Sequence, residues 1–440
     1  MMDLLSDNLD WLEERLEKAD PCEKSGRILN VNGLVIESEG PEVALGEVCR
    51  IESDRSGESA PAEVVGFREN RVLLMPLGEI NDLHPGCRVV SSHEDNAVPV
   101  GVNLLGRVLN GRMHPIDGKG RLLAPTTGKL KNAPPDPMSR KSIETPFETG
   151  VKAIDTFVPL GHGQRVGIFS GSGVGKSVLL GMLARNSESD VNVIALVGER
   201  GREVKDFIDK HLGEEGMRKS VVIVTTSDQP APLRIRAANL ATAIAEDFRN
   251  QGKNVMLLMD SVTRLAMAQR EIGLAVGEPP TTRGYTPSVF GLLPKLLERS
   301  GTGEVGSITA IYTVLVEGDD MNEPVADAVR RILDGHIVLS RKLANANLFP
   351  AIDVLDSISR LYLDVCSEEE IRLVTEARDL LAVYRHNEDL INVGAYAPGT
   401  NAQIDRAVEK FPAIREFLRQ VHGTKFSRAN SFIELGEILG

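Results

Sequence analysis

The stretch that decides the fold reads Ser170-Gly171-Ser172-Gly173-Val174-Gly175-Lys176-Ser177. The apolar run Val166–Phe169 precedes it and the helical pattern Lys176–Arg185 follows it, which is the strand–loop–helix context of a phosphate-binding loop. Glycines let the backbone turn tightly enough for its N–H groups to point at phosphate oxygens, and the helix start adds partial positive charge. The strict pattern has glycine at the first position, where the small Ser170 can serve instead. The sequence therefore predicts a nucleotide-binding site.

The residues of this segment have distinct expected roles. We expect Lys176 to act in catalysis by reaching the β- and γ-phosphates, and we expect the helix start that carries it to face solvent while the site is empty. Ser177 is expected to ligate Mg²⁺ through its hydroxyl. The predicted nucleotide-binding residues here are Ser170, Gly171, Ser172, Gly173, Val174, Gly175, Lys176, Ser177 and Val178.

Acidic residues follow two further apolar runs. Asp260 ends the run Val255–Met259, and a carboxylate there can hold Mg²⁺ opposite the phosphate loop. Glu199 and Glu203 come just after the run Val191–Val197, and ligands bind at the carboxyl ends of strands in such sheets. A carboxylate at this position can polarise an attacking water. Spacing alone leaves a second interpretation open, namely an exposed charged loop.

The pattern around the loop predicts a doubly wound α/β domain over residues 96–366. Continuous apolar runs suit parallel strands buried on both faces, with helices between them. The expected strands are Val166–Phe169, Val191–Val197, Ser220–Thr225, Val255–Met259 and Ile308–Val314, and the expected helices include Lys176–Arg185 and Ala231–Asn250. Residues 367–440 predict a C-terminal helical domain, with helices at Glu368–Arg385 and Asn401–Val421.

Two other patterns precede residue 96. Residues 1–20 predict an amphipathic helix that Pro21 ends, which gives a first domain of residues 1–21. Its apolar stripe consists of Leu5, Leu9, Leu12 and Leu16. Residues 24–95 alternate short apolar runs with turns and predict a small antiparallel β-barrel. The runs are Gly26–Ile36, Glu47–Ile51, Ala62–Phe67 and Arg71–Pro76, with a hairpin loop at Glu69-Asn70.

Composition narrows the range of functions. The 440 residues include 63 acidic and 50 basic side chains, a formal net charge of −13, which is the opposite of the balance usual for nucleic-acid-binding proteins. The four cysteines show no CxxC pair, so we expect neither a structural zinc site nor a disulfide framework, and a reducing cytoplasm fits. No apolar run reaches the roughly 18 residues that a transmembrane segment needs.

Three segments together resemble the family of the ATP synthase α and β subunits, from about residue 24 to the C-terminus. They are the loop at 170–177, Gly198-Glu199-Arg200-Gly201-Arg202-Glu203 and Pro350-Ala351-Ile352-Asp353-Val354-Leu355-Asp356-Ser357-Ile358-Ser359-Arg360. The resemblance implies a RecA-like core of the doubly wound class that binds ATP and Mg²⁺.

The resemblance also implies roles for residues around the loop. Glu199 would be the water-activating carboxylate of catalytic subunits, where non-catalytic subunits have an amide. Glu203 would hold a Mg²⁺-bound water. Arg200 would act with the catalytic residues, and Arg264 would line the nucleotide site.

Two further implied roles belong to residues at the ends of the segment 350–360: Arg360, its last residue, and Phe349, which directly precedes it. Arg360 would be an arginine finger that reaches a neighbouring subunit's site, although a local salt bridge stays open as an alternative. Phe349 would stack on adenine, with ordinary core packing as its alternative. One chain would then supply the loop, the carboxylate and the finger, so identical copies could complete one another's sites.

Within that family, other segments resemble the export ATPases of type III secretion. They are 260–273, Gly277-Glu278-Pro279-Pro280, Tyr285-Thr286-Pro287-Ser288-Val289-Phe290 and Leu296-Leu297-Glu298-Arg299, while Gly394-Ala395-Tyr396 resembles the flagellar branch more than the injectisome branch. This implies a homohexamer that energises protein export, with a stator protein bound at the N-terminal helix. The other implied partners are the export gate, a stalk subunit and substrate–chaperone complexes, and the implied place is cytoplasmic and peripheral at the inner face of the membrane.

Two alternatives are disfavoured. A rotary ATP synthase catalytic subunit would carry its own sequence around residues 260–300, which this chain lacks. A hexameric nucleic-acid translocase would bind strands with stacked aromatics and basic residues on its barrel. Residues 24–95 hold one aromatic residue, Phe67, so we expect no nucleic-acid partner.

Overall fold

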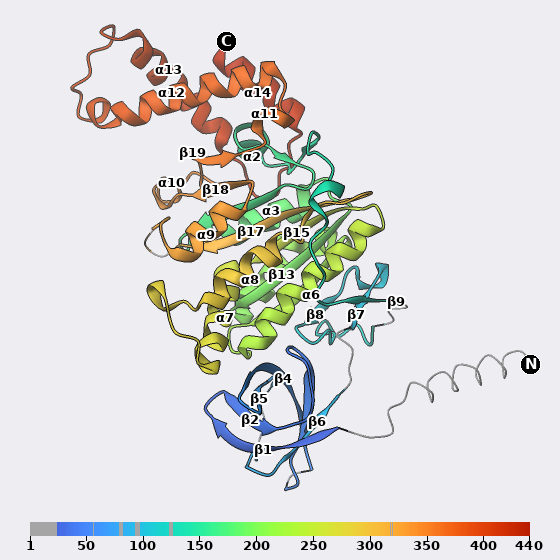
Figure 1. Cartoon of the computed structure of the whole chain (residues 1–440). Coiled ribbons are helices and arrows are strands. Elements are labelled where there is room, and N and C mark those ends of the chain that lie inside the picture. Colours follow the sequence, from blue (N-terminus) through green and yellow to red (C-terminus); the bar gives the residue numbers. More distant parts are fainter. Residues whose placement is uncertain are drawn as a thin grey trace, which may run out of the picture. The chain divides into compact units, whose positions relative to one another are not determined.

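The computed structural model describes residues 24–55, 57–78, 82–92, 97–122, 126–316, 318 and 320–440. The chain divides into two compact units, Met1–Asp95 and Asn96–Gly440 (Figure 1). The amphipathic helix predicted at residues 1–20 lies outside the described residues and stays a prediction.

The described part of the first unit is a closed antiparallel barrel with strand order β1-β2-β5-β4-β3-β6. The strands are β1 (Ser25–Asn32), β2 (Val35–Glu39), β3 (Val48–Glu52), β4 (Ser59–Arg68), β5 (Arg71–Pro76) and β6 (Arg88–Ser91). Alternate residues point inward, as in β4, where Ala60, Ala62 and Val64 are buried. The predicted small β-barrel is therefore confirmed.

One expectation for the barrel is wrong. The run Gly26–Ile36 forms two strands rather than one, because the chain reverses at Gly33, whose φ of 59° suits a tight turn. The dipeptide Asn32-Gly33 is a turn signal, but apolar Leu34 follows it and continues the run. The hairpin expected at Glu69-Asn70 is present between β4 and β5.

The second unit is built on a mostly parallel sheet of order β19-β18-β12-β17-β15-β13-β14-β8. Its strands are β8 (Val108–Asn110), β12 (Arg165–Ser170), β13 (Val191–Glu199), β14 (Ser220–Thr226), β15 (Asn254–Asp260), β17 (Ser307–Leu315), β18 (Gly335–Leu339) and β19 (Ile352–Ser359). Strand β19 is antiparallel to β18, and β16 (Gly301–Thr302) pairs antiparallel with β17. The other pairs are parallel, and neighbouring strands are mostly not consecutive in the chain, so the predicted doubly wound class is confirmed.

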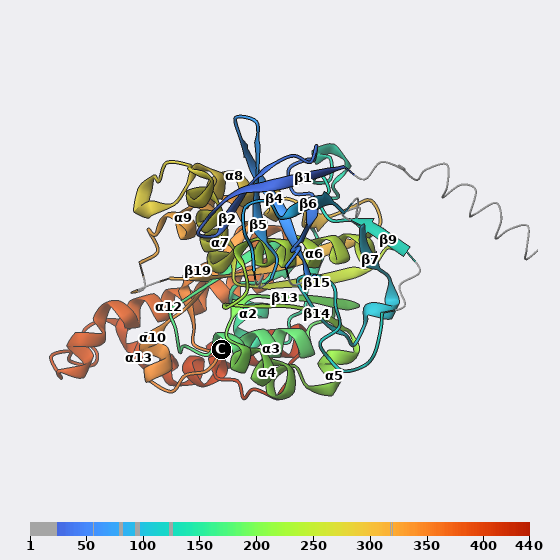
Figure 2. The ribbon, with the colours of Figure 1, turned by 90° about the horizontal axis from the view of Figure 1, so that it is seen from below.

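Helices cover both faces of this sheet (Figures 1 and 2). One face carries α6 (Ala231–Asn250), α7 (Val262–Val276), α8 (Pro287–Leu297) and α9 (Pro324–Ile332), and the other carries α3 (Lys176–Asn186), α4 (Gly201–Asp206) and α5 (Gly213–Arg218). In β13, Val193 and Ala195 enter the core under α6, whereas Ile194 and Leu196 enter the core under α3. Burial on both faces explains why the core strands have continuous apolar sequences.

Shorter elements complete the second unit. They are η1 (Val102–Leu104), β7 (Ala97–Val100), β9 (Thr126–Lys129), η2 (Pro137–Ser139), β10 (Pro146–Phe147), α2 (Lys152–Phe157), β11 (Leu160–Gly161), the π-helix η3 (Phe207–Leu212), η4 (Thr282–Gly284), α10 (Arg341–Asn345) and α11 (Tyr362–Val365). Strands β7 and β9 pair with each other, as do β10 and β11.

Helices end the chain: α12 (Glu368–Asn392), α13 (Ala402–Leu418) and α14 (Arg428–Leu439). Helix α12 begins at a capping box, in which the Ser367 hydroxyl accepts from the Glu370 N–H and the Glu370 carboxylate accepts from the Ser367 N–H. Their apolar sides join the core on the α3 face of the sheet. In the part of the chain that is described, no helix is long and apolar enough to span a membrane.

Candidate active site

The phosphate-loop segment joins β12 to α3 in the predicted strand–loop–helix order. Gly173 and Gly175 have φ angles of 77° and 90°, a backbone conformation that a side chain would strain. Val174 is buried against the protein, whereas Ser172 and Ser177 are exposed. The loop and the start of α3 therefore face solvent, where their N–H groups can meet a phosphate.

Lys176, the first residue of α3, lies between two carboxylates. Its Nζ donates to Asp260 Oδ1 at 2.5 Å and lies 3.8 Å from Glu199 Oε1. Asp260 ends β15 and Glu199 ends β13, so the loop and both acids meet at the carboxyl edge of the sheet. The start of α3 faces solvent, as expected, but the Lys176 side chain itself is 12% exposed and held by these acids.

Glu199 has the environment of a general base. Burial first, and the charge of Asp260 second, raise the pKa of the Glu199 carboxyl from 4.5 to about 7, while Lys176 opposes the shift. Glu199 Oε1 is buried and accepts no hydrogen bond from the described residues. A water between Glu199 and a bound phosphate would satisfy this oxygen. The exposed-loop alternative does not hold for Glu199, because its side chain is 13% exposed.

Sequence reasoning missed one residue of this cluster. Thr313 lies in β17, between β12 and β15, and its hydroxyl donates to Asp260 Oδ1 at 2.6 Å. That oxygen also accepts from Lys176, so the two donors fix the carboxylate together. A threonine within an apolar strand carries no functional signal, because β-branched residues favour strands anyway. The parallel register that pairs Met259 with Tyr312 is what brings Thr313 to Asp260.

Arg264 and Phe349 lie next to glycines of the site. A Cβ atom on Gly198 would be 2.9 Å from Arg264 Cβ, so a glycine is needed for α7 to approach the end of β13. A Cβ atom on Gly175 would be 3.4 Å from the Phe349 ring. The ring is 40% exposed, so Phe349 lies beside the phosphate loop rather than within the core.

Glu203 and Arg200 occupy the rim of the site. They form an ion pair at 3.4 Å, with side chains 49% and 78% exposed. Glu203, in the first turn of α4, lies close enough to Glu199 to add to its raised pKa. The structure thus places Glu203 with the acidic cluster and leaves Arg200 largely in solvent.

Arg360 lies far from this cluster. Its backbone N–H donates to Asp334 O at 3.0 Å, and the Asp334 N–H donates to O of Arg165, the first residue of β12. The phosphate loop begins at the last residue of β12, about 17 Å from the first, because five steps of about 3.3 Å separate the ends of this six-residue strand. Because β19 runs antiparallel to β18, its end reaches the amino edge of the sheet. Arg360 is exposed there, and its Nη2 donates to Arg330 O at 3.3 Å.

The residues at the carboxyl edge fit a magnesium nucleotide. The loop glycines leave the backbone open to phosphate, and Glu199 presents a buried oxygen without a donor. Ser177 and Asp260 offer a hydroxyl and a carboxylate, the hard oxygen ligands that Mg²⁺ prefers.

A helix-start lysine beside a strand-end aspartate, after a glycine-rich loop, defines a P-loop ATPase. Family models match the chain in three parts: the ATP synthase alpha/beta family β-barrel domain over residues 28–93, that family's nucleotide-binding domain over 150–359, and the T3SS EscN ATPase C-terminal domain over 366–437. The chain belongs to the ATP synthase alpha/beta family.

Similar proteins that cover most of the chain support the same family. The flagellum-specific ATP synthase of Bacillus subtilis is 53% identical over 408 residues, 92% of this chain and 93% of that protein. The type 3 secretion system ATPase of Sinorhizobium fredii is 50% identical over 395 residues, 90% of this chain and 88% of that protein. The solved structure of the assembled ATPase EscN, from the enteropathogenic E. coli type III secretion system, is 43% identical with a TM-score of 0.89, and covers 94% of this chain and 100% of that one.

These similarities confirm the resemblance to the export ATPases of type III secretion, the fold class and the assignment as an ATP-hydrolysing enzyme. They do not support a rotary synthase subunit, since the C-terminal region matches the type III secretion domain.

Proposed function

We propose that this chain hydrolyses Mg²⁺-ATP at the boundaries between identical subunits of a hexameric ring, and that hydrolysis energises the export of flagellar proteins. The observation that carries the proposal is the separation within one chain: Lys176, Asp260 and Glu199 meet at one edge of the sheet, whereas Arg360 lies at the other. A second copy is then needed to complete the site.

At the carboxyl edge, each residue has a task in hydrolysis. The N–H groups of the loop and the Lys176 ammonium would hold the phosphates, and Ser177 and Asp260 would hold Mg²⁺, which supplies charge to stabilise the phosphoryl group. To reach the phosphates, Lys176 would have to leave Asp260, and that carboxylate could then serve as a ligand of Mg²⁺. Glu199 orients the attacking water and accepts its proton.

Residues around this centre bind and position the nucleotide. Glu203 would hold a water bound to Mg²⁺, and Arg200 and Arg264 would neutralise phosphate charge from the rim and from α7. Phe349 stacks on the adenine, since its partly exposed ring lies beside Gly175.

Arg360 supplies charge that the subunit's own loop lacks. An arginine finger stabilises the charge on the transferring phosphoryl group and is worth about 10³–10⁵ in rate. Arg360 suits this role in trans, because it is exposed beyond the end of the edge strand β19.

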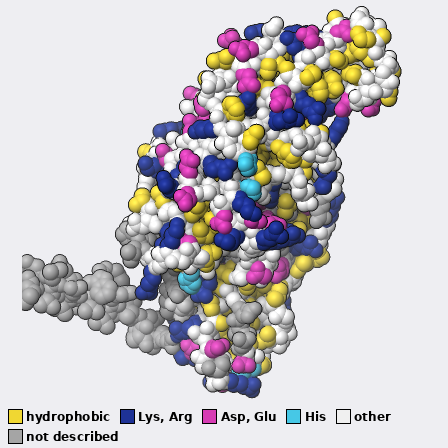
Figure 3. All heavy atoms as spheres, turned by 180° about the vertical axis from the view of Figure 1, so that it is seen from behind, with side chains coloured by type: hydrophobic (Ala, Val, Ile, Leu, Met, Phe, Trp, Pro, Cys, Tyr) yellow, Lys and Arg dark blue, Asp and Glu magenta, His cyan; other side chains and the backbone are white. Residues whose placement is uncertain are grey.

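The proposed partners engage both ends of the chain. Hydrophobic side chains gather over the C-terminal helices in Figure 3, and Leu390 and Val393, at the end of α12, are 50% and 76% exposed. This apolar tip suits a helical stalk subunit or a substrate–chaperone complex, and EscN has been solved with its central stalk EscO. We propose that the leucine stripe of residues 1–20 binds a stator protein, which places the ring beside the export gate at the inner face of the membrane.

The flagellar branch is the finer part of the proposal. Gly394-Ala395-Tyr396 and the similarity to flagellum-specific relatives favour it. A strain that lacks its own flagellar export ATPase should regain export with the wild-type chain and not with Glu199→Gln. Failure of both chains would reject the flagellar assignment, provided that purified wild-type protein hydrolyses ATP.

A further inference from the structure

A tight turn in the barrel places a histidine and a cysteine side by side. In His84-Pro85-Gly86-Cys87, the Cys87 N–H donates to His84 O at 3.2 Å, and Gly86 has a φ of 101°. Proline followed by a positive-φ glycine is the pattern of a type II turn. Two backbone hydrogen bonds to Ile28 of β1 anchor the turn, one from Gly86 N and one to Cys87 O.

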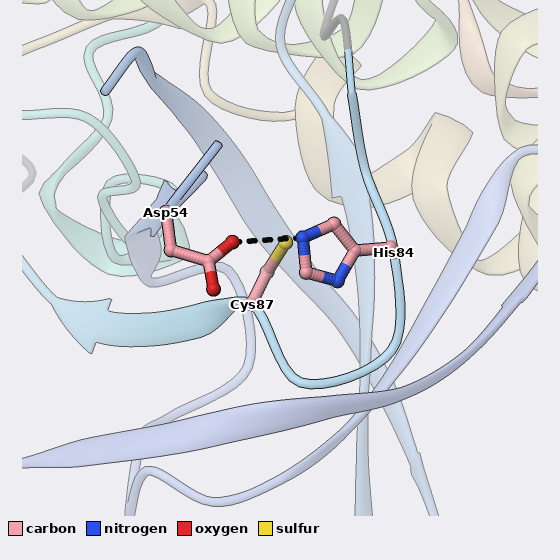
Figure 4. A group of neighbouring side chains, drawn as sticks. All are labelled: Asp54, His84 and Cys87. Atoms are coloured by element: carbon pink, nitrogen blue, oxygen red, sulfur yellow. Dashed lines mark hydrogen bonds and ion pairs between the residues drawn. The ribbon is translucent and has the colours of Figure 1, made fainter. Parts of the chain in front are cut away.

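A third potential ligand reaches the turn from a different part of the barrel. Asp54 follows β3, and its Oδ1 lies 2.8 Å from His84 Nε2. One atom from each of Asp54, His84 and Cys87 lies within 4.8 Å of the others. Figure 4 shows the Cys87 sulfur beside the line that joins the carboxylate to the ring. The carboxylate is exposed, the ring is partly exposed and the sulfur is buried, so the cluster opens to solvent on the Asp54 side.

The hydrogen-bond partners of the two His84 ring nitrogens indicate that a cation can lie between the ring and Asp54. Nδ1 lies 2.9 Å from the Pro85 carbonyl oxygen, which accepts hydrogen bonds and cannot donate them. A neutral imidazole with its proton on Nδ1 has a lone pair on Nε2, and that lone pair faces the Asp54 carboxylate. Two acceptors face each other unless a proton or another cation lies between them. A histidine that donates from one nitrogen to a backbone carbonyl, leaving the other for a metal, is the usual arrangement of a metal ligand.

We propose that Asp54, His84 and Cys87 form a binding site for a divalent zinc-type cation. A carboxylate, an imidazole and a thiolate are the ligands that Zn²⁺ prefers, and three protein ligands leave a fourth tetrahedral position for water. Asp54 must withdraw from His84 by about half an ångström, since bonds of about 2.0–2.2 Å at a tetrahedral angle separate two ligands by roughly 3.4 Å. Asp54 lies in an exposed turn, where such a shift is possible.

The site would tie two loops of the barrel together: the turn after β3 and the segment that leads into β6. The expectation of no structural zinc site rests on the absence of a CxxC pair. The pair here is a histidine and a cysteine at the same spacing, and its third ligand is distant in sequence.

Cobalt(II) provides a direct test on the nucleotide-free, full-length protein. Co²⁺ bound by a cysteine thiolate gives a ligand-to-metal charge-transfer band in the near ultraviolet, which binding at the phosphate loop cannot produce. We expect this band to saturate at one equivalent per chain and Zn²⁺ to displace it. Cys87→Ala should abolish the band, and the matched control Cys49→Ala, which alters the other buried barrel cysteine, should keep it.

His84→Gln keeps the test decisive if Cys87→Ala fails to fold. It should weaken zinc binding by more than about 10- to 100-fold, the cost of losing even an outer-sphere partner. Zinc should also raise the thermal midpoint of the wild type and not that of His84→Gln. A missing thiolate band in the wild type, or a band that persists in Cys87→Ala, would overturn the site and leave His84 and Asp54 as an ion pair.

Discussion

Arg360 and Lys176 lie at opposite ends of strand β12 in the same chain. Backbone hydrogen bonds link Arg360 through Asp334 to the first residue of β12. At the other end, the last residue of β12 leads into the phosphate loop, and Lys176 is the first residue of the helix after that loop. Two cations suited to the same phosphoryl group therefore cannot reach it within one subunit. This separation is the structural reason to expect hydrolysis at a boundary between copies.

Replacing the loop lysine should remove activity and also weaken the nucleotide-free fold. Lys176→Ala takes away the cation between Asp260 and Glu199, and removing one partner of a buried ion pair costs about 3–5 kcal/mol. Phosphate release should fall to background, and the thermal midpoint should drop. Asp260→Asn added to Lys176→Ala should restore most of the midpoint but none of the activity. Near wild-type turnover by Lys176→Ala would reject the assignment of the phosphate loop.

Glu199→Gln should separate binding from chemistry. The amide keeps the shape of the side chain but cannot accept a proton, so nucleotide affinity should hold while turnover falls by about 10²–10⁴-fold. Fluorescent-nucleotide binding and single-turnover hydrolysis measure the two effects. A loss of binding instead would point to a structural role for Glu199.

The raised pKa of Glu199 predicts two pH dependences. As a base it must be ionised, so kcat/KM should rise with pH up to about 7 and then level off. Its carboxyl pKa is raised on folding, so its contribution to stability is present below about 4.5 and is lost as the pH rises through about 7. Glu199→Gln should therefore raise the thermal midpoint of the empty protein at pH 8 relative to wild type, and not at pH 4. An equal effect at both pH values would argue against the raised pKa.

Thr313 should matter through its hydroxyl. Thr313→Val removes the donor to Asp260 while keeping the shape, and a hydrogen bond to a charged group is worth about 1.5–3 kcal/mol. We expect kcat/KM to fall by about 10- to 100-fold, with a higher Mg²⁺ requirement. Thr313→Ser should stay near wild type. Equal losses in the two variants would show that packing, rather than the hydroxyl, is at work.

The N-terminal residues should serve a partner rather than the chemistry. Deleting residues 1–20 should abolish binding of the stator protein while basal hydrolysis stays unchanged. Pull-down with the purified stator and phosphate release on the same preparation measure both properties. A complex of full strength after the deletion would reject the proposed docking role.

Much of the fold could be predicted because its signals are local. The run Val255–Met259 is apolar throughout and Val191–Val197 is apolar except at Asn192, as suits strands buried on both faces, and each lies within an observed strand. The reversal at Gly33 was missed although Asn32-Gly33 is a turn signal, because apolar Leu34 occupies the turn and makes the two strands look like one run. Strand β19 was not predicted either, since it includes polar Asp353, Asp356 and Ser357.

The site residues that belong to a sequence motif could be predicted, whereas the contacts that depend on strand register or on an ion pair could not. The loop and the acids at strand ends stand at recognisable points in the sequence. Thr313 reaches Asp260 through strand register, and the paired state of Lys176 follows from three-dimensional proximity. Neither is visible in a linear pattern.

Mixing two inactive chains tests hydrolysis at subunit boundaries most directly. Arg360→Ala keeps the carboxylate but lacks the finger, and Glu199→Gln keeps the finger but lacks the carboxylate. If Arg360 acts across a boundary, mixed rings contain boundaries at which an intact Glu199 meets an intact Arg360, so hydrolysis should partly recover and rise steeply with protein concentration. Activity that stays at the level of the separate variants at every mixing ratio, with a wild-type specific activity independent of concentration, would contradict the ring mechanism.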